Sequence, residues 1–310
     1  MSRYAILFPG QGSQRVGMGA DLFDAQPEFL GDAADQIVGW SLESLVTEGP
    51  IEELTRTQFA QPALFGVSYA LWRALAAELP APPGAAAGHS LGEYTALAAA
   101  SALSYEDGLR LVAERGRSMA EAAASGEPSG MAALIGADLD HAEALAADRR
   151  SDGGRLWVAN VNAPTQIVLA GSEADIAWLC ENAGSLGIRR AVALAVAGAF
   201  HSPYMAPAAA RLGAALDTTR FSSPSFPVYA NTTARPVDNP RRQLAEQLVR
   251  PVRFAETLQQ MFDDGISTFI HVGPGDVTAS LVKRTIPEAI VHVVSELGDI
   301  AAVAADASIQ

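Results

Sequence analysis

The chain is poor in cysteine, in positive charge and in long apolar runs, and each shortage excludes a class of protein. Its single cysteine, Cys180, excludes an internal disulfide and any zinc site built from cysteines. The 21 basic residues are outnumbered by 35 acidic ones, and the net charge of −14 argues against nucleic acid or an anionic membrane as the main partner. The most apolar run, residues 191–200, is far shorter than the ~20 residues that a transmembrane helix needs.

What the sequence does have is apolar material for a core. Apolar side chains make up 49% of its 310 residues, which excludes intrinsic disorder as the main state. No signal-like segment opens the chain, and residues 6–8 instead predict the start of a strand. We therefore expect a cytoplasmic protein, which we also expect to be a monomer. Cys180 lies beside Trp178 and Leu179 in a helical pattern, so we expect its thiol to be buried and inert.

Short apolar runs alternate with longer helical patterns along most of the chain, which predicts an α/β protein with a mostly parallel sheet. The predicted strands are residues 4–8, 85–88, 226–231, 268–272 and 290–294. The predicted helices are residues 60–79, 91–100, 105–123, 206–216 and 243–262.

Between residues 128 and 198 the pattern changes to strand, helix, two strands, helix and strand. The predicted segments are 131–135, 140–147, 157–161, 166–170, 173–183 and 190–196. This βαββαβ order is that of a ferredoxin-like unit. We therefore expect a small subdomain of residues 128–198, inserted into a large domain of residues 1–127 and 199–310.

A candidate nucleophile lies in Gly88-His89-Ser90-Leu91-Gly92, which fits the pattern G-x-S-x-G. A strand of small residues precedes it and a helical pattern follows, which is the setting of a nucleophile elbow. Glycines on both sides permit the tight turn that exposes the serine oxygen at a helix N-terminus, where a developing oxyanion is favoured. The motif predicts that the large domain is α/β-hydrolase-like.

A nucleophilic serine needs a base, and the chain has five histidines. An elbow should turn the side chains of His89 and Ser90 apart, His141 starts a polar helix, and His271 lies inside a strand. His201 instead follows an apolar strand at the junction of the two domains, where loops often carry function. His201 and His292 therefore remain as the candidates that the residues alone provide.

Five motifs, in this order, resemble those of the malonyl-CoA:acyl carrier protein transacylases and the acyltransferases of polyketide synthases. They are residues 8–14 (FPGQGSQ), 58–63 (QFAQPA), 88–93 (GHSLGE), 199–202 (AFHS) and 247–252 (QLVRPV). The resemblance covers residues 4 to about 295. It implies a discrete acyltransferase that serves fatty-acid or polyketide synthesis.

The resemblance also implies roles for individual residues. Ser90 would be the nucleophile and His201 its general base, while Gln11 and the backbone N–H of Leu91 would form the oxyanion hole. The surroundings of Gln247 would help to hold the histidine through main-chain carbonyl groups, so no third acidic residue is required. An amide donor on a glycine-rich turn, as Gln11 is, suits an oxyanion hole physically.

Arg115 matches the family arginine that binds the free carboxylate of malonyl, and its position supports this role independently. Its helical neighbours Leu111, Val112 and Met119 form an apolar face. An arginine on such a face is costly to bury unless a negative group meets it. The substrate carboxylate would supply that charge, whereas the alternative is a structural ion pair with a distant acid.

Phe200 and Leu91 match the malonyl-using members of the family, and Phe200 would fill the space that an α-methyl group needs. Such steric discrimination is worth only ~1–3 kcal/mol. The resemblance implies no metal and no tightly bound cofactor, with malonyl-CoA as substrate and an acyl carrier protein as partner. Four alternatives remain: an acyl hydrolase that edits stalled carrier proteins, a transacylase for another acyl group, an esterase that uses His292, and a docking subunit without activity.

The carrier protein is usually acidic, so we expect a local basic patch on this acidic chain. The candidate residues are Arg189, Arg190, Arg241, Arg242, Arg250, Arg253, Lys283 and Arg284.

Overall fold

The computed structural model describes residues 4–306 and residue 309, and its centre is a five-stranded sheet. The strands lie in the order β7 (Val228–Tyr229), β2 (Ala85–Gly88), β1 (Tyr4–Phe8), β8 (Thr268–Val272) and β9 (Ile290–Val294). Every pairing between them is parallel, as the sequence predicts. The carboxyl ends of β1 and β2 therefore lie side by side, with Phe8 opposite Gly88.

Alternate side chains of β1 enter two separate cores, because successive residues of a strand point to opposite faces. Ile6 and Phe8 pack with the helices of one face, and Ala5 and Leu7 pack with those of the other. The first face is covered mainly by α6 (Thr57–Glu78), α7 (Gly92–Ala99), α8 (Tyr105–Ser125) and α11 (Ala206–Thr218). The second is covered by α13 (Phe254–Asp263) and α14 (Val277–Thr285).

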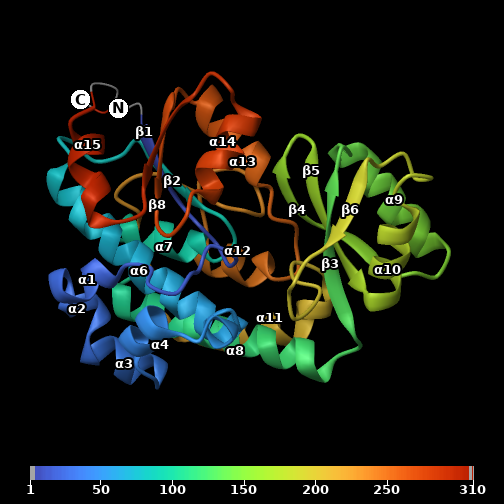
Figure 1. Ribbon diagram of the computed structural model, residues 1–310, viewed down its shortest axis with the longest axis horizontal. Coiled ribbons are helices and arrows are strands. Elements are labelled where there is room, and N and C mark those ends of the chain that lie inside the picture. The colour runs from blue at the N-terminus through green and yellow to red at the C-terminus, as the bar shows by residue number, and fades with distance from the viewer. Residues whose placement is uncertain (1–3, 307–308, 310) are drawn as a thin grey trace.

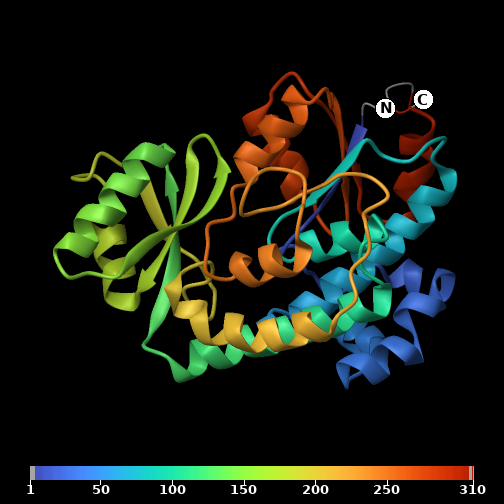
Figure 2. The ribbon, with the colours of Figure 1, turned by 180° about the vertical axis from the view of Figure 1, so that it is seen from behind.

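The predicted ferredoxin-like unit is confirmed, and Figures 1 and 2 show it beside the larger domain. Its strands pair antiparallel in the order β4 (Leu156–Ala163), β5 (Gln166–Ser172), β3 (Ser129–Ile135) and β6 (Arg190–Ala193). Its helices are α9 (Leu139–Ser151) and α10 (Glu173–Asn182), and together these elements enclose a core of their own. The division at residues 127/128 and 198/199 stays a prediction.

The two sheets are joined by backbone hydrogen bonds between β4 and the loop after α12 (Pro240–Gln247). The N–H of Val161 donates to Val252 O at 2.8 Å, and the N–H of Val252 donates to Ala159 O at 2.9 Å. The two segments that connect the large domain to the small subdomain also contact each other, since the N–H of Ala199 donates to Ser129 Oγ at 3.2 Å. These contacts hold the small sheet against the loops that carry the site.

Three expectations about elements are wrong. The helix expected at residues 243–262 is two helices, α12 and α13, because Pro251 lacks an N–H and restricts Arg250 before it. The strand expected at 226–231 is only the two residues of β7, and β6 ends at Ala193, so a loop leads to His201. The thiol of Cys180 is half-buried rather than buried.

Short helices that the sequence patterns did not predict complete the fold. They are α1 (Ala20–Ala25), α2 (Pro27–Leu30), α3 (Asp32–Val38), α4 (Leu42–Glu48), α5 (Ile51–Leu54), α15 (Ile300–Ala304) and the 3₁₀ turns Pro203–Met205 and Leu297–Asp299. None of the helices among the described residues has the length and apolarity needed to cross a membrane.

Candidate active site

Ser90 sits on a sharp turn between β2 and α7, with a positive φ of 51°. L-residues rarely adopt this left-handed conformation, and strained residues of this kind cluster at active sites. The flanking glycines are required sterically. A Cβ at Gly88 would overlap the backbone of Gly92, and a Cβ at Gly92 would overlap the carbonyl oxygen of Phe8. The elbow that the sequence predicts is present.

The turn is braced by the side chain of Asn231, which is completely buried just beyond β7. Its Oδ1 accepts the backbone N–H of Ser90 at 2.7 Å, and its Nδ2 donates to Gly88 O at 2.7 Å. One amide therefore holds the backbone on both sides of the turn, at Gly88 and at Ser90.

His201 faces the serine from the loop that returns from the small subdomain. Its Nε2 lies 2.8 Å from Ser90 Oγ, and its Nδ1 lies 2.8 Å from the main-chain oxygen of Gln247. Because a carbonyl can only accept, Nδ1 carries the proton and Nε2 is left as the acceptor for the serine hydroxyl. Burial, and then the charge of Arg115, lower the pKa of His201 to about 3, so the imidazole is neutral near pH 7.

Arg115 of α8 is 1% exposed and reaches the same serine. Its Nη2 donates to Ser90 Oγ and to Gln247 Oε1, both at 2.9 Å, and its Nη1 donates to Gln61 Oε1 at 2.7 Å. All three acceptors are neutral. None of the ion pairs among the described residues includes Arg115, and its Nε has no partner there. No direct ion pair of the kind that the sequence left open is found among the described residues, although Glu93 reaches Arg115 through the amide of Gln247.

A cavity of about 430 Å³ opens above these groups, between the large domain and the small sheet. Ser90, His201, Arg115, Gln11 and Phe200 all line it, so it brings together five of the seven predicted site residues. Its wall also includes Asn160, Asn162, Gln166, Val168, Val277 and Leu281.

The two predicted oxyanion donors are placed differently. Gln11 lines the cavity, and its Nε2 donates one hydrogen bond to Thr57 Oγ1 at 3.2 Å, which leaves its second N–H. The Leu91 side chain is buried away from the cavity, and none of the hydrogen bonds described for residues 4–306 and 309 is donated by its backbone N–H. Gln247 lies behind the site, in contact with both His201 and Arg115.

The remaining histidines have other partners. His271 is a satisfied core residue, as expected, with Nδ1 2.5 Å from Thr278 Oγ1 and Nε2 3.0 Å from Gly273 O. His89 lines the cavity but turns away from the serine, with its Nε2 2.7 Å from Asn162 Oδ1. His292 lies on β9 near Asp306 and does not line the cavity. Of the two candidates left by the sequence, the structure brings only His201 to Ser90.

Three residues in contact with the site were missed by the sequence reasoning, namely Gln61, Glu93 and Asn231. Gln61 and Glu93 lie inside two of the quoted motifs. Each interrupts an apolar helical run, between Ala60 and Leu64 and between Leu91 and Ala100, and a polar residue in such a run is itself a signal.

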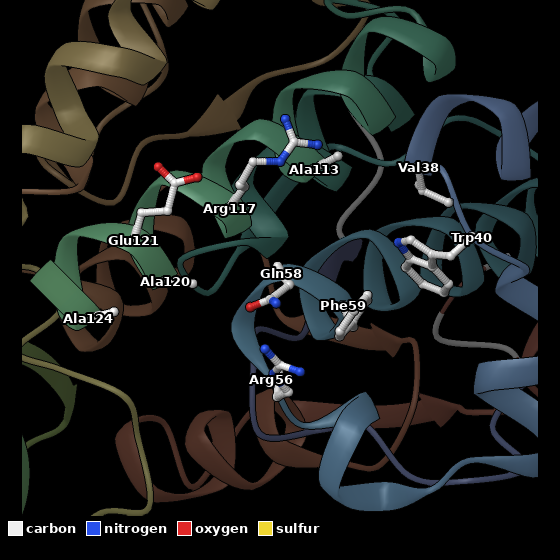
Figure 3. Close-up of a pocket in the computed structure, with 10 residues that line it drawn as sticks. All are labelled: Val38, Trp40, Arg56, Gln58, Phe59, Ala113, Arg117, Ala120, Glu121 and Ala124. Atoms are coloured by element: carbon white, nitrogen blue, oxygen red, sulfur yellow. The ribbon is translucent and has the colours of Figure 1, made fainter.

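A second cavity, of about 420 Å³, lies on the outer side of α8 (Figure 3). Arg117 and Glu121 of α8 face it from one side, and Trp40, Arg56 and Phe59 from the other. None of the predicted site residues lines it. No group of three His, Cys, Asp or Glu side chains within the described part of the chain is arranged to hold a metal ion.

The proposed basic patch is dispersed in the structure. Three of its members pair with acids, as Arg242 with Asp238, Arg250 with Glu246 and Arg253 with Glu256. Arg241 donates to the main-chain oxygens of Leu216 and Thr219. Lys283 and Arg284 lie exposed on α14, and Arg284 contacts Gln166, which lines the cavity.

With this geometry in place, comparison with known proteins defines the class. Residues 6–305 match the family model described as the acyl transferase domain, and the chain belongs to this family. It is 41% identical to the malonyl CoA-acyl carrier protein transacylase of Bacillus subtilis over 289 residues, which cover 92% of this chain and 90% of that protein. It is 40% identical to the polyketide biosynthesis protein ThaF of Burkholderia thailandensis, but covers only 24% of that longer protein.

Solved structures agree with these relatives. The acyl carrier protein S-malonyltransferase of Vibrio cholerae has a TM-score of 0.91 at 34% identity, over 97% of this chain and all of that one. A malonyl-transacylase solved in complex with a type II polyketide acyl carrier protein has a TM-score of 0.90 at 34% identity, over 97% of this chain and 98% of that one. The predicted fold class and family are confirmed.

Proposed function

We propose that this chain is a cytoplasmic serine acyltransferase that moves a malonyl group from malonyl-CoA to the phosphopantetheine thiol of an acyl carrier protein. The observation that carries the proposal is the position of Ser90 Oγ, 2.8 Å from His201 Nε2 and 2.9 Å from Arg115 Nη2. A base beside the hydroxyl activates it, and a buried cation beside it suits an acyl group that ends in a carboxylate. The names of the relatives support the same reaction.

In the first half-reaction, His201 Nε2 takes the proton from Ser90 Oγ, which attacks the thioester carbon of malonyl-CoA. The C–O bond to serine forms, the C–S bond breaks, and the imidazolium returns the proton to the departing CoA thiolate. The main-chain oxygen of Gln247 holds Nδ1–H throughout, and so keeps the ring in the correct tautomer and orientation.

The carboxylate of malonyl would take Arg115 as its partner. It would accept two parallel N–H bonds from the guanidinium and give the buried cation a carboxylate in direct contact, which it does not have now. The Arg115 donor that now contacts Ser90 Oγ would then leave the hydroxyl free to attack. In this way Arg115 favours binding of an acyl group that ends in a carboxylate over binding of a neutral acyl group.

The negative charge that develops on the thioester oxygen must be stabilised by hydrogen-bond donors. We assign these to the second N–H of the Gln11 side chain and to the backbone N–H of Leu91, which lies at the start of α7, where the helix dipole also favours an anion. Phe200 is 6% exposed and lines the cavity beside His201, so it would oppose an α-methyl group on the substrate.

In the second half-reaction, the carrier thiol gives its proton to His201 and attacks the malonyl-serine ester. The C–S bond to the carrier forms, the C–O bond to Ser90 breaks, and the proton returns to Ser90 Oγ. The kinetics are therefore ping-pong. An editing hydrolase would place water in this step, but it would have less need of Arg115.

Intact-protein mass after brief incubation with malonyl-, acetyl- or methylmalonyl-CoA tests the proposal. We expect an adduct with malonyl-CoA in preference to the other two, and no adduct in Ser90→Ala. Addition of a holo carrier protein should then discharge the adduct onto the carrier. Steady release of free CoA without an adduct would favour the hydrolase, and neither an adduct nor free CoA would contradict the proposed substrate.

A further inference from the structure

A second carboxylate lies buried directly beneath the nucleophile, on the first turn of α7. Glu93 is 1% exposed, and no basic side chain pairs with it among the ion pairs of the described residues. Its Oε2 accepts Gln247 Nε2–H at 2.6 Å and the backbone N–H of Asn231 at 3.1 Å, while its Oε1 has no partner in the described part of the chain. Burial of an ionisable group without a charged partner costs folding free energy, and such a group is therefore a candidate for a function.

The two partners of Glu93 are the two residues that hold the site together. Gln247 bonds to Ser90 O through its Nε2 at 3.0 Å, to Arg115 through its Oε1, and to His201 through its main-chain oxygen. Asn231 holds the backbone N–H of the serine. One carboxylate therefore contacts both groups that position the nucleophile, the base and the buried cation.

Charge on Glu93 strengthens the orientation of the Gln247 amide that the carbonyl of Ser90 and the guanidinium of Arg115 also favour. An ionised carboxylate can only accept, so it selects the Nε2 side of the amide and leaves Oε1 to face Arg115. A protonated acid or an amide at position 93 can also donate. The Gln247 Nε2–H then loses its charged acceptor, and only Ser90 O and Arg115 still hold the amide in place.

We propose that Glu93 is a positioning residue for acyl transfer, whose ionised carboxylate fixes Gln247 and Asn231 and through them Ser90, His201 and Arg115. The part of this inference that concerns Arg115 rests on the proposed function. The part that concerns Ser90 and His201 requires only that Ser90 is a nucleophile. Glu93 touches neither substrate nor the reacting atoms.

The titration of Glu93 gives this role a signature. Burial raises the pKa of its carboxyl to about 7, although the hydrogen bonds from Gln247 and Asn231 and the charge of Arg115 act in the opposite direction. The other titratable groups around it do not change charge near pH 7. Burial lowers the pKa of Arg115, but a guanidinium keeps its charge in proteins. Burial raises the pKa of Tyr94, and the pKa values of His201 and His89 are lowered. Acidification below pH 7 should therefore protonate Glu93 and weaken its hold on Gln247 and Asn231.

The rate at which an alkyl fluorophosphonate modifies Ser90 tests the proposal, because this probe needs neither CoA nor a carboxylate. Serine oxygen bonds to phosphorus, fluoride leaves, and the proton passes to His201. The rate should be measured from pH 5.5 to 8.5 in the wild type, Glu93→Gln and Glu93→Asp. Glu78→Gln, an exposed change at the end of α6, is the matched control.

We expect the wild-type rate to fall below a midpoint near pH 7. Glu93→Gln should be slower by about tenfold or more at pH 8 and should lack that midpoint, since small misplacements of catalytic groups have effects of this size. Glu93→Asp should recover part of the rate and keep a midpoint. A rate of Glu93→Gln equal to wild type, or a midpoint that persists in Glu93→Gln, would overturn the proposal. So would a wild-type rate that is flat over this range, whatever the variants do.

Unfolding in urea provides an independent readout. Because folding raises the pKa of Glu93, the folded state holds the proton more tightly, and the wild type should lose stability as pH rises from about 4.5 towards 7. Glu93→Gln should lack this loss. On acidification the wild type should thus gain stability relative to Glu93→Gln, while the reactivity of its Ser90 falls. Parallel plots of unfolding free energy against pH for the two proteins would contradict the proposal. If the wild type is phosphonylated but forms no malonyl adduct, the proposed substrate fails and the role of Glu93 stands.

Discussion

Arg115 Nη2 and Ser90 Oγ are 2.9 Å apart, so a buried guanidinium donates to the hydroxyl that His201 contacts from the other side. The cation has only neutral acceptors, from Gln61, Gln247 and the serine itself. A carboxylate that entered the cavity would gain a strong, desolvated ion pair and would remove a competing hydrogen bond from the nucleophile. Under the proposed function, substrate selection and activation of the serine would therefore be coupled through Arg115.

Replacement of Arg115 by alanine should abolish the preference for a dicarboxylic acyl group. We expect kcat/KM for malonyl-CoA to fall on the order of 100-fold, because loss of one partner of a buried charge pair costs roughly 2–5 kcal/mol and each 1.4 kcal/mol is tenfold. The value for acetyl-CoA should fall much less. Arg110→Ala, at an exposed arginine of the same helix paired with Asp107, is the control. Equal losses for both substrates would contradict the assignment.

The charge state of His201 gives a second prediction. Burial and the charge of Arg115 lower its pKa to about 3, so its imidazole should stay neutral from pH 5 to 8. Arg115→Gln removes one of the three causes, the others being burial and the charge of His89, and should move the titration of His201 to higher pH. The ring resonances in NMR spectra, assigned by comparison with His201→Gln, measure this directly. A titration of His201 that is unchanged in Arg115→Gln would show that the arginine charge does not reach the base.

The sequence predicts the elbow and the base for different reasons. Gly88 and Gly92 are visible as a local pattern, and their steric need is local too, since both sit within the turn around Ser90. His201 could only be narrowed to a pair with His292 from the residues, because the contact with Ser90 joins positions 111 residues apart. Resemblance to a family supplied what local pattern could not.

Asn231 and Gln247 show what a local pattern leaves out. Both are polar residues in segments whose pattern predicts a strand end and a long helix. Neither pattern shows that both residues contact Ser90, and only the family resemblance gave Gln247 a place near the base. Pro251 is a helix breaker that can be read in the sequence. The helical patterns before and after it nevertheless led to the prediction of one continuous helix. The loop that Pro251 creates is what lets Val252 pair with β4 and bring the small sheet to the site.

Asn231→Ala should destabilise the fold as well as the site. It leaves the backbone N–H of Ser90 and the carbonyl of Gly88 without the partner they have now. Each buried group left unpaired costs about 1–3 kcal/mol, so the free energy of unfolding in urea should fall by at least that amount. Asn239→Ala removes only the cap of α12, worth about 1 kcal/mol, and provides the comparison. A smaller effect at Asn231 than at Asn239 would show that the elbow does not depend on this brace.

Lys283 and Arg284 should contribute to docking of the carrier protein. They are exposed on α14, and Arg284 donates to Gln166 at 2.5 Å, at the wall of the cavity through which the phosphopantetheine arm would pass under the proposed function. An acidic carrier would meet a local positive charge there despite the net charge of −14 of the chain. Reversal of both charges, in Lys283→Glu with Arg284→Glu, should raise KM for the carrier about tenfold, an effect of charged rim residues that weakens as salt is added. Arg242→Glu, at a cation already paired with Asp238, should change it little, and an unchanged KM in the double variant would place the docking surface elsewhere.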